Sequence, residues 1–327
     1  MNLKIKEWYG ESLFSKPLIV ALFALLCCAL WGSATPFIKI GYELVLPERD
    51  VASTILFAGI RFFFAGVLTV LIFSIARKRF LLPRVESLGK IGVVSVFQTI
   101  LQYIFFYVGL ANTSGVKGTI LTGSSTFFAI LVSSLVFRIE KLNTKKIIAC
   151  VLGISGIVVI NLNGLSLSVD PLGDGFCILS AVSLAVSSTL IKIFSKDEDP
   201  VTISGYQFIL GGAVMVGIGL SFGGKISLVD FKGVLVLVYL SFLSAIAYSL
   251  WGILLKYNPV SKVTVFSFTT PIFGVLLTEL LLTEESNTGA LNLIAALALV
   301  FIGIFILNYR PKKAEQSIDT SAKKGAE

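Results

Sequence analysis

Ten long apolar segments constrain the fold of this chain more than any other feature of its sequence. Each holds about 20 residues, the length that an α-helix needs to cross the roughly 30 Å hydrocarbon core of a bilayer. Only helices and closed barrels satisfy their backbone hydrogen bonds there, and barrel strands would be shorter and alternating. The sequence therefore predicts an all-α polytopic membrane protein with ten transmembrane helices, at residues 17–39, 53–76, 90–111, 118–137, 147–162, 173–194, 203–222, 233–255, 263–282 and 288–308.

The composition agrees with this prediction. Hydrophobic residues make up 55% of the chain and charged residues only 14%, whereas a soluble domain carries about 25% charged residues. The net charge of +8 does not indicate nucleic-acid binding, because the basic residues fall in short clusters between apolar segments. Histidine is absent, and the four cysteines lie inside apolar segments without a CxxC pattern. We therefore expect no metal site and no cofactor.

The distribution of lysine and arginine predicts the orientation in the membrane. With a cytoplasmic N-terminus, the cytoplasmic segments hold 21 of these residues and the outer loops hold 4. This asymmetry predicts a cell (inner) membrane protein with both termini in the cytoplasm. Residues 1–16 would form a cytoplasmic segment, and 309–327 a disordered cytoplasmic tail. The first apolar segment is too long for a typical signal peptide, so we expect it to be retained.

The chain also repeats itself. Residues 98–140 align without a gap on residues 243–285, and an adjoining stretch, Gly59 to Gly66, aligns on Gly205 to Gly212. We therefore expect two five-helix repeats, at 17–162 and 163–308. Because five is odd, the two repeats must be inverted relative to each other. Inverted repeats exchange conformations around a site near the membrane midplane, which is typical of transporters that work by alternating access.

Several short motifs also resemble a known family. The first half has Trp31-Gly32-Ser33, Arg61-Phe62, and Glu140 before Gly153 and Gly156, and the second half ends with Pro271 and Glu285 before Gly303. In these motifs the chain resembles the EamA-type branch of the drug/metabolite transporter superfamily. The resemblance implies a ten-helix inverted-repeat fold and the export of amino acids or other small metabolites. It also implies a central cavity between the first, third, fourth, sixth, eighth and ninth helices. Thr126 stands where the second half has Pro271, which predicts a helix break on one side only.

Polar side chains at helical spacing mark the same helices. Stripes of Ser, Thr, Gln, Tyr and Trp recur every three to four residues and so share a helix face. Such stripes either line a cavity or join helices as small, hydrogen-bonding contacts. The residues that we predict to bind substrate are Trp31, Gln98, Gln102, Tyr103, Thr122, Ser183, Ser187, Tyr248, Trp251 and Thr270.

Ionisable residues at membrane depth are the candidates for coupling or gating, because burying a charge in lipid is costly. Glu279 lies inside the ninth predicted helix, where a carboxyl group suits a proton-coupled step. Arg61 lies inside the second. It could bind backbone carbonyls, extend to the outer surface, or pair with Glu279. Lys39 and Lys192 lie at predicted helix ends, and Glu140 and Glu285 are expected to cap helices or tie loops.

The sequence thus favours a transporter of a small-molecule substrate that exports amino acids or related metabolites, in exchange for protons in one version of the hypothesis. The alternatives are a channel, a lipid-translocating protein, or an importer of a small metabolite or sugar-like solute. No HExxH, GxSxG or phosphate-binding glycine motif is present, so we expect no enzyme activity. The sequence is compatible with a monomer or a homodimer in the lipid bilayer.

Overall fold

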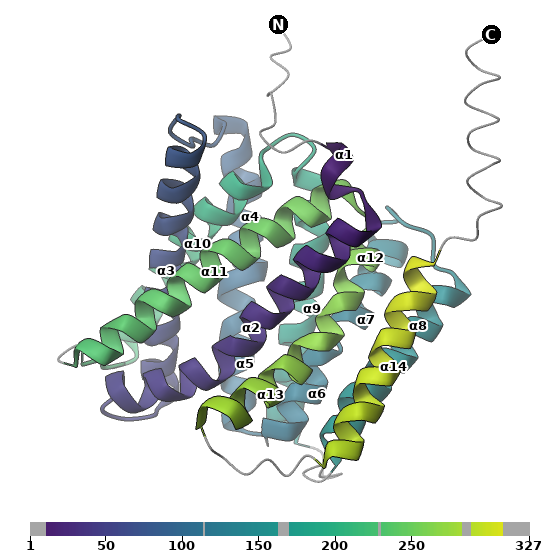
Figure 1. Ribbon diagram of the computed structural model, residues 1–327. Coiled ribbons are helices and arrows are strands. Elements are labelled where there is room, and N and C mark those ends of the chain that lie inside the picture. Colours follow the sequence, from purple (N-terminus) through teal and green to yellow (C-terminus); the bar gives the residue numbers. More distant parts are fainter. Residues whose placement is uncertain (1–10, 114, 163–169, 228–229, 283–288, 310–327) are drawn as a thin grey trace, which may run out of the picture.

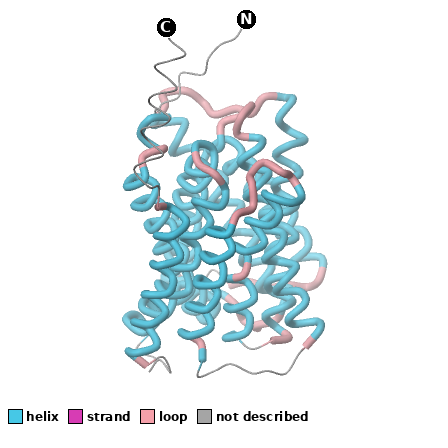
Figure 2. Tube along the Cα trace, turned by 90° about the vertical axis from the view of Figure 1, so that its right-hand side faces the viewer, coloured by secondary structure: helices cyan, strands magenta, loops and turns pink. Residues whose placement is uncertain are grey.

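A computed structural model describes residues 11–113, 115–162, 170–227, 230–282 and 289–309, which form a bundle of helices (Figure 1). The uninterrupted helices are α1 (Glu11–Phe14), α2 (Pro17–Val45), α3 (Val51–Ala76), α8 (Thr144–Ile160), α9 (Pro171–Phe194), α10 (Pro200–Ser221), α11 (Phe231–Tyr257) and α14 (Ala290–Asn308). Interrupted spans are α4 (Leu88–Ser95) with α5 (Gln102–Ala111), α6 (Gly115–Gly123) with α7 (Ser125–Leu131), and α12 (Val260–Thr264) with α13 (Thr270–Leu282). The helices run between two ends of the bundle where the loops gather (Figure 2).

All ten predicted membrane segments are helical in the structure. Nine spans within the described residues are long and apolar enough to cross a membrane. The tenth, α8, has 17 residues and extends about 26 Å, which is near the lower limit for a transmembrane helix. Helix α2 continues to Val45, so Lys39 is an exposed residue within the helix rather than at its end. The predicted disordered tail falls on residues 310–327, which lie outside the described residues.

Short polar residues fix where several helices begin. The carboxylate of Asp199 accepts a hydrogen bond from the backbone N–H of Thr202, and Asp50 and Asp170 cap α3 and α9 in the same way. Proline occupies the first position of α2, α9 and α10, where its missing N–H has no partner to lose. These caps satisfy backbone donors that would otherwise be left unpaired near the membrane surface.

Helices α3 and α10 form the most extensive helix pair in the bundle. Their contact is a seam of glycines through which the two backbones touch. A Cβ atom on Gly212 would lie 2.3 Å from the backbone nitrogen of Phe63, and one on Gly66 would lie 2.5 Å from the carbonyl oxygen of Gly205. No larger residue fits at these positions unless the helices move apart. The α3–α10 pair is therefore a close approach of backbones from the two halves.

In the other helix contacts, where a helix of one half packs against helices of the other half, its counterpart packs against the equivalent helices. Helix α2 packs against α11 and α13, while its counterpart α9 packs against α5, α6 and α7. Counterparts α8 and α14 pack against each other at one side of the bundle (Figure 1). These contacts agree with the five-helix repeats predicted from the sequence. The boundary between the repeats, at residues 162 and 163, remains a prediction.

Three of the ten spans are interrupted. A π-helical turn, Val96–Leu101, separates α4 from α5, and a turn at Ser124 separates α6 from α7. A 3-10 turn, Val265–Thr269, precedes α13 and its Pro271. The prediction of a break on one side only is therefore wrong, because the fourth span breaks without a proline. There the hydroxyl of Ser124 donates to the carbonyl of Leu121, which offers the backbone an alternative to continuous helix.

Candidate substrate-binding site

A small cavity lies between helices of both halves. Its volume is about 30 Å³. That space holds roughly two water molecules and is too small for an amino acid. The residues that line it come from α2, α7, α9, α11, α12 and the 3-10 turn, and they are Trp31, Ser125, Thr126, Ala129, Leu184, Ala185, Ser188, Trp251, Thr264 and Ser267.

Two of the predicted binding residues form the aromatic wall of this cavity. The rings of Trp31 and Trp251 meet edge to face with their centroids 4.9 Å apart, and Trp31 also meets Tyr248 at 5.1 Å. The indole N–H of Trp31 is buried and has no acceptor among the described residues. An indole in this position offers both an apolar face and one unused hydrogen-bond donor to a solute.

Counterpart residues of the two halves touch each other beside this wall. The hydroxyl groups of Tyr103 and Tyr248, which the repeat aligns, share a hydrogen bond of 2.9 Å. Phe62 and its counterpart Phe208 stack nearly parallel, with centroids 5.1 Å apart and planes 9° apart. Both pairs therefore lie where the two halves of the chain meet.

The predicted glutamines lie on the third span. Gln98 lies within the π-helical turn and Gln102 directly after it, and both side chains are buried. The carbonyl oxygen of each amide lacks a donor among the described residues. Neither residue lines the cavity. Thr99, which lies between them, donates a hydrogen bond to the amide oxygen of Gln207 on α10 at 2.7 Å. Two unused amide acceptors thus lie in the core of the third span, where π turns often mark functional positions.

None of the Ser and Thr residues predicted to bind substrate lines the cavity. Thr122 and Ser187 donate to backbone carbonyls of their own helix turns, and Ser183 is buried without lining the cavity. Thr270 begins α13 and also lies outside the lining. Instead Ser188 lines the cavity, one residue along from the prediction. One residue is a rotation of about 100° around an α-helix, and the polar stripe alone did not fix the angle.

The two predicted coupling residues do not pair with each other. Arg61 is only 4% exposed, and its guanidinium lies 4.3 Å from the ring centre of Phe62 and 5.9 Å from that of Tyr103. Arg61 forms no ion pair within the described chain, so neither pairing with Glu279 nor extension to the outer surface holds. Glu279 lies half-buried in α13.

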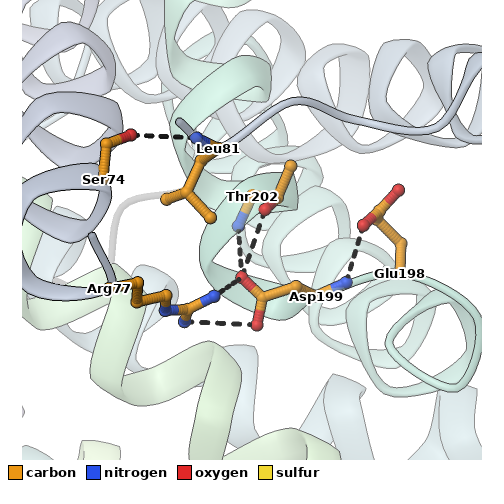
Figure 3. A network of polar contacts seen from close by, with 6 residues as sticks. All are labelled: Ser74, Arg77, Leu81, Glu198, Asp199 and Thr202. Carbon is orange, nitrogen blue, oxygen red and sulfur yellow. Dashed lines mark hydrogen bonds and ion pairs between the residues drawn. The ribbon is translucent and has the colours of Figure 1, made fainter. Parts of the chain in front are cut away.

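Ion pairs and charged hydrogen bonds join the halves at both ends of the bundle. At the end that carries α1, Arg77 binds the carboxylate of Asp199 at 2.8 Å, beside the contact of Glu198 with the Asp199 backbone (Figure 3). Lys90 binds Asp197 at 2.6 Å, and its ammonium lowers the pKa of that carboxyl. At the opposite end Lys117 binds Asp174 at 2.6 Å. Among the described residues, ion pairs therefore join the two halves at both ends of the bundle.

One loop prediction is confirmed and its counterpart is untested. Glu140 accepts hydrogen bonds from Lys146 and from the hydroxyl of Ser261, so it ties the loop before α8 to the start of α12. Glu285 lies outside the described residues. Lys192, predicted to lie at a helix end, lies in the last turn of α9 and donates to the backbone carbonyl of Lys256 at 2.7 Å. These contacts are structural rather than part of the cavity.

Together these features define a polytopic α-helical membrane protein with a small cavity between the two halves of its bundle. The model of the EamA-like transporter family matches residues 18–162 and again residues 171–309, and the chain belongs to this family. The chain is thus a multi-pass membrane protein and a transporter of the drug/metabolite type.

Similar proteins come from distant organisms. A WAT1-related chloroplastic protein of Arabidopsis thaliana is 23% identical over 85% of this chain and 67% of its own length. An uncharacterized transporter of Synechocystis is 27% identical over 84% of this chain and 88% of its own length. A crystal structure of a protein 17% identical to this chain has a TM-score of 0.70, covering 88% of this chain and 97% of that one. This last likeness shows that the fold is shared.

Proposed function

We propose that this protein exports amino acids or related small metabolites by alternating access, with the cavity between Trp31 and Trp251 as its central site. The observation that carries the proposal is the composition of the cavity wall, to which helices of both halves contribute. A site shared by two halves changes its access when the halves move relative to each other. The cavity of about 30 Å³ is too small for an amino acid, so the halves would have to move before such a solute could bind.

The proposal includes an orientation and a coupling ion. The excess of lysine and arginine in one set of loops supports a cytoplasmic location for the end that carries α1. Glu279, half-buried in a membrane-spanning helix, would exchange a proton during the cycle. Glu279→Gln should then remove the dependence of flux on a pH gradient and leave the chain folded. Flux through this variant that still follows the pH gradient would contradict proton coupling at Glu279.

Mass spectrometry of medium and cell extract tests the transport proposal. Cells that overproduce the wild-type protein should accumulate one class of metabolite outside, and cells with Trp31→Ala or Trp251→Ala should not. The control is Phe305→Ala, which removes an aromatic ring that is 63% exposed on the outside of α14. Equal metabolite levels for wild type and both tryptophan variants, in cells and in proteoliposomes loaded with the same solutes, would contradict the assigned site.

A further inference from the structure

Arg61 is a buried cation whose counter-charge is not supplied by the described residues. Its side chain is 4% exposed, its Nε atom is buried without an acceptor, and it forms no ion pair within the described chain. Its position is central, since the next residue, Phe62, stacks on its counterpart across the junction of the halves. Buried arginines in membrane spans normally pair with an acid or with backbone carbonyls, because an isolated charge in hydrocarbon is costly.

The packing of the helices does not by itself require this charge. The counterpart of Arg61 in the second half is Gln207, whose uncharged amide is fully buried and accepts a hydrogen bond from Thr99. The same place in the repeat thus accommodates a neutral amide of similar length. Helix packing alone therefore does not explain the positive charge of Arg61, and this charge has a role in the first half that its neutral counterpart Gln207 cannot have.

We propose that Arg61 binds the carboxylate of the transported solute. This inference rests on the proposed transport function and names the class of substrate. A carboxylate takes the Nε–H and one terminal N–H of a guanidinium together, in two parallel hydrogen bonds. Nε–H is the donor that lacks an acceptor in the described structure. The solute would bring the missing negative charge into the site and would leave with it.

The surroundings of Arg61 favour a carboxylate over a phosphate. The neighbours of its guanidinium are the rings of Phe62 and Tyr103, and the hydroxyl of Tyr103 is hydrogen-bonded to that of Tyr248. A phosphate group carries roughly two negative charges at neutral pH and requires several cations or helix N-termini. A single guanidinium matches one negative charge, and phenol hydroxyls add donors for its second lone pairs.

The site connects to the cavity through a chain of aromatic contacts. Tyr103 lies beside Arg61 and shares its hydroxyl hydrogen bond with Tyr248, whose ring meets Trp31 at the cavity wall. A solute with its carboxylate at Arg61 would place the rest of its body toward the tryptophans. Charge recognition and the apolar wall would then belong to one substrate site that widens when the bundle opens.

The test compares acids with their own amides. The melting temperature of the full-length protein in detergent is measured with each common L-amino acid and with each corresponding 2-oxo acid. A parallel measurement uses the carboxamide of the same acid. We expect at least one acid to raise the melting temperature of the wild type while its amide does not. Arg61→Gln should weaken the binding of that acid at least tenfold, and Arg61→Lys less. Lys232→Gln removes one exposed positive charge and serves as the control.

Each outcome decides the proposal. It is overturned if no acid stabilises the wild type, if acid and amide stabilise it equally, or if Arg61→Gln binds the acid as wild type does. If Arg61→Gln does not fold, the wild-type comparison of acid with amide still decides. Flux in proteoliposomes separates this inference from the proposed function. If wild type and Arg61→Gln transport neutral solutes equally, the transport function stands and the role of Arg61 is contradicted. If the wild type binds an acid but transports no solute, the role of Arg61 stands and the transport function is contradicted.

Discussion

The two halves of the molecule share a framework and differ in the side chains at its centre. Counterpart residues that touch are identical, in the pairs Phe62 with Phe208 and Tyr103 with Tyr248. Other counterparts differ, as Arg61 does from Gln207 and Trp251 from Phe106. The two touching pairs must fit their own copies, whereas Arg61 and Trp251 have no such constraint.

The largest expected effect concerns the ends of the paired helices α3 and α10. Arg77 ends α3 and binds Asp199 from the other half, while Phe222 ends α10 without a charge. Arg77→Ala leaves the carboxylate of Asp199 buried without its cation, and should lower the free energy of unfolding by about 3 kcal/mol. Arg84→Ala is the control, because Arg84 contacts Glu198 through its backbone N–H. Equal stability of the two variants in chemical denaturation would refute the assignment.

A smaller effect is expected at the glycine seam. Gly212→Val places carbon atoms against the backbone of Phe63 and should cost about 2 kcal/mol by forcing α3 and α10 apart. Gly217→Ala, on the exposed side of α10, meets no atom within 4 Å and should leave stability unchanged or raise it. Thermal unfolding in detergent distinguishes the two. A Gly212→Val protein as stable as Gly217→Ala would show that the backbones do not touch.

The tyrosine pair allows a direct test of contact between counterparts. Tyr103→Phe and Tyr248→Phe each remove one partner of the same hydrogen bond, and each should cost about 1 kcal/mol. The double variant should cost little more than either single one, because the bond is lost only once. Additive losses in a double-mutant cycle would mean that the two hydroxyl groups act independently.

The smallest effect should come from the turns that follow α3 and α10. Lys78 has a φ angle of 52° and Gly223 one of 81°, so both lie in the left-handed region that favours glycine. Lys78→Gly should raise the free energy of unfolding by about 0.5–1 kcal/mol, and Gly223→Ala should lower it by a similar amount. Effects of the same sign in thermal unfolding would contradict the equivalence of the two turns.

The sequence predicted the framework better than the site. Lengths of apolar segments specify the ten helices, because the bilayer sets one length for all of them. Trp31 and Trp251, predicted to bind substrate, both line the cavity, and their role in binding remains a prediction. The π turn beside Gln98 and the break at Ser124 were not predicted, because neither is marked by a proline in the sequence.

Rotation about the helix axis separates the predicted Ser187 from Ser188, which lines the cavity. Ser187 and Ser188 are adjacent in α9, and only the second faces the cavity. Both are small and polar, so their chemistry does not reveal which one points inward. The hydroxyl of each donates to the same carbonyl, that of Leu184. Such ambiguity is inherent in hydroxyl stripes, which satisfy themselves along their own helix and therefore carry little information about orientation.

The hydrogen bond between Tyr103 and Tyr248 has one further consequence. It joins two chemically identical groups at the junction of two equivalent halves, yet it contains a single proton, so one hydroxyl donates and the other accepts. No such bond can itself be symmetric. Even perfectly duplicated halves would therefore differ at their centre at every instant, and reversing the direction of the bond would exchange their roles. The position of this one proton makes the two halves different, although their backbones repeat the same arrangement.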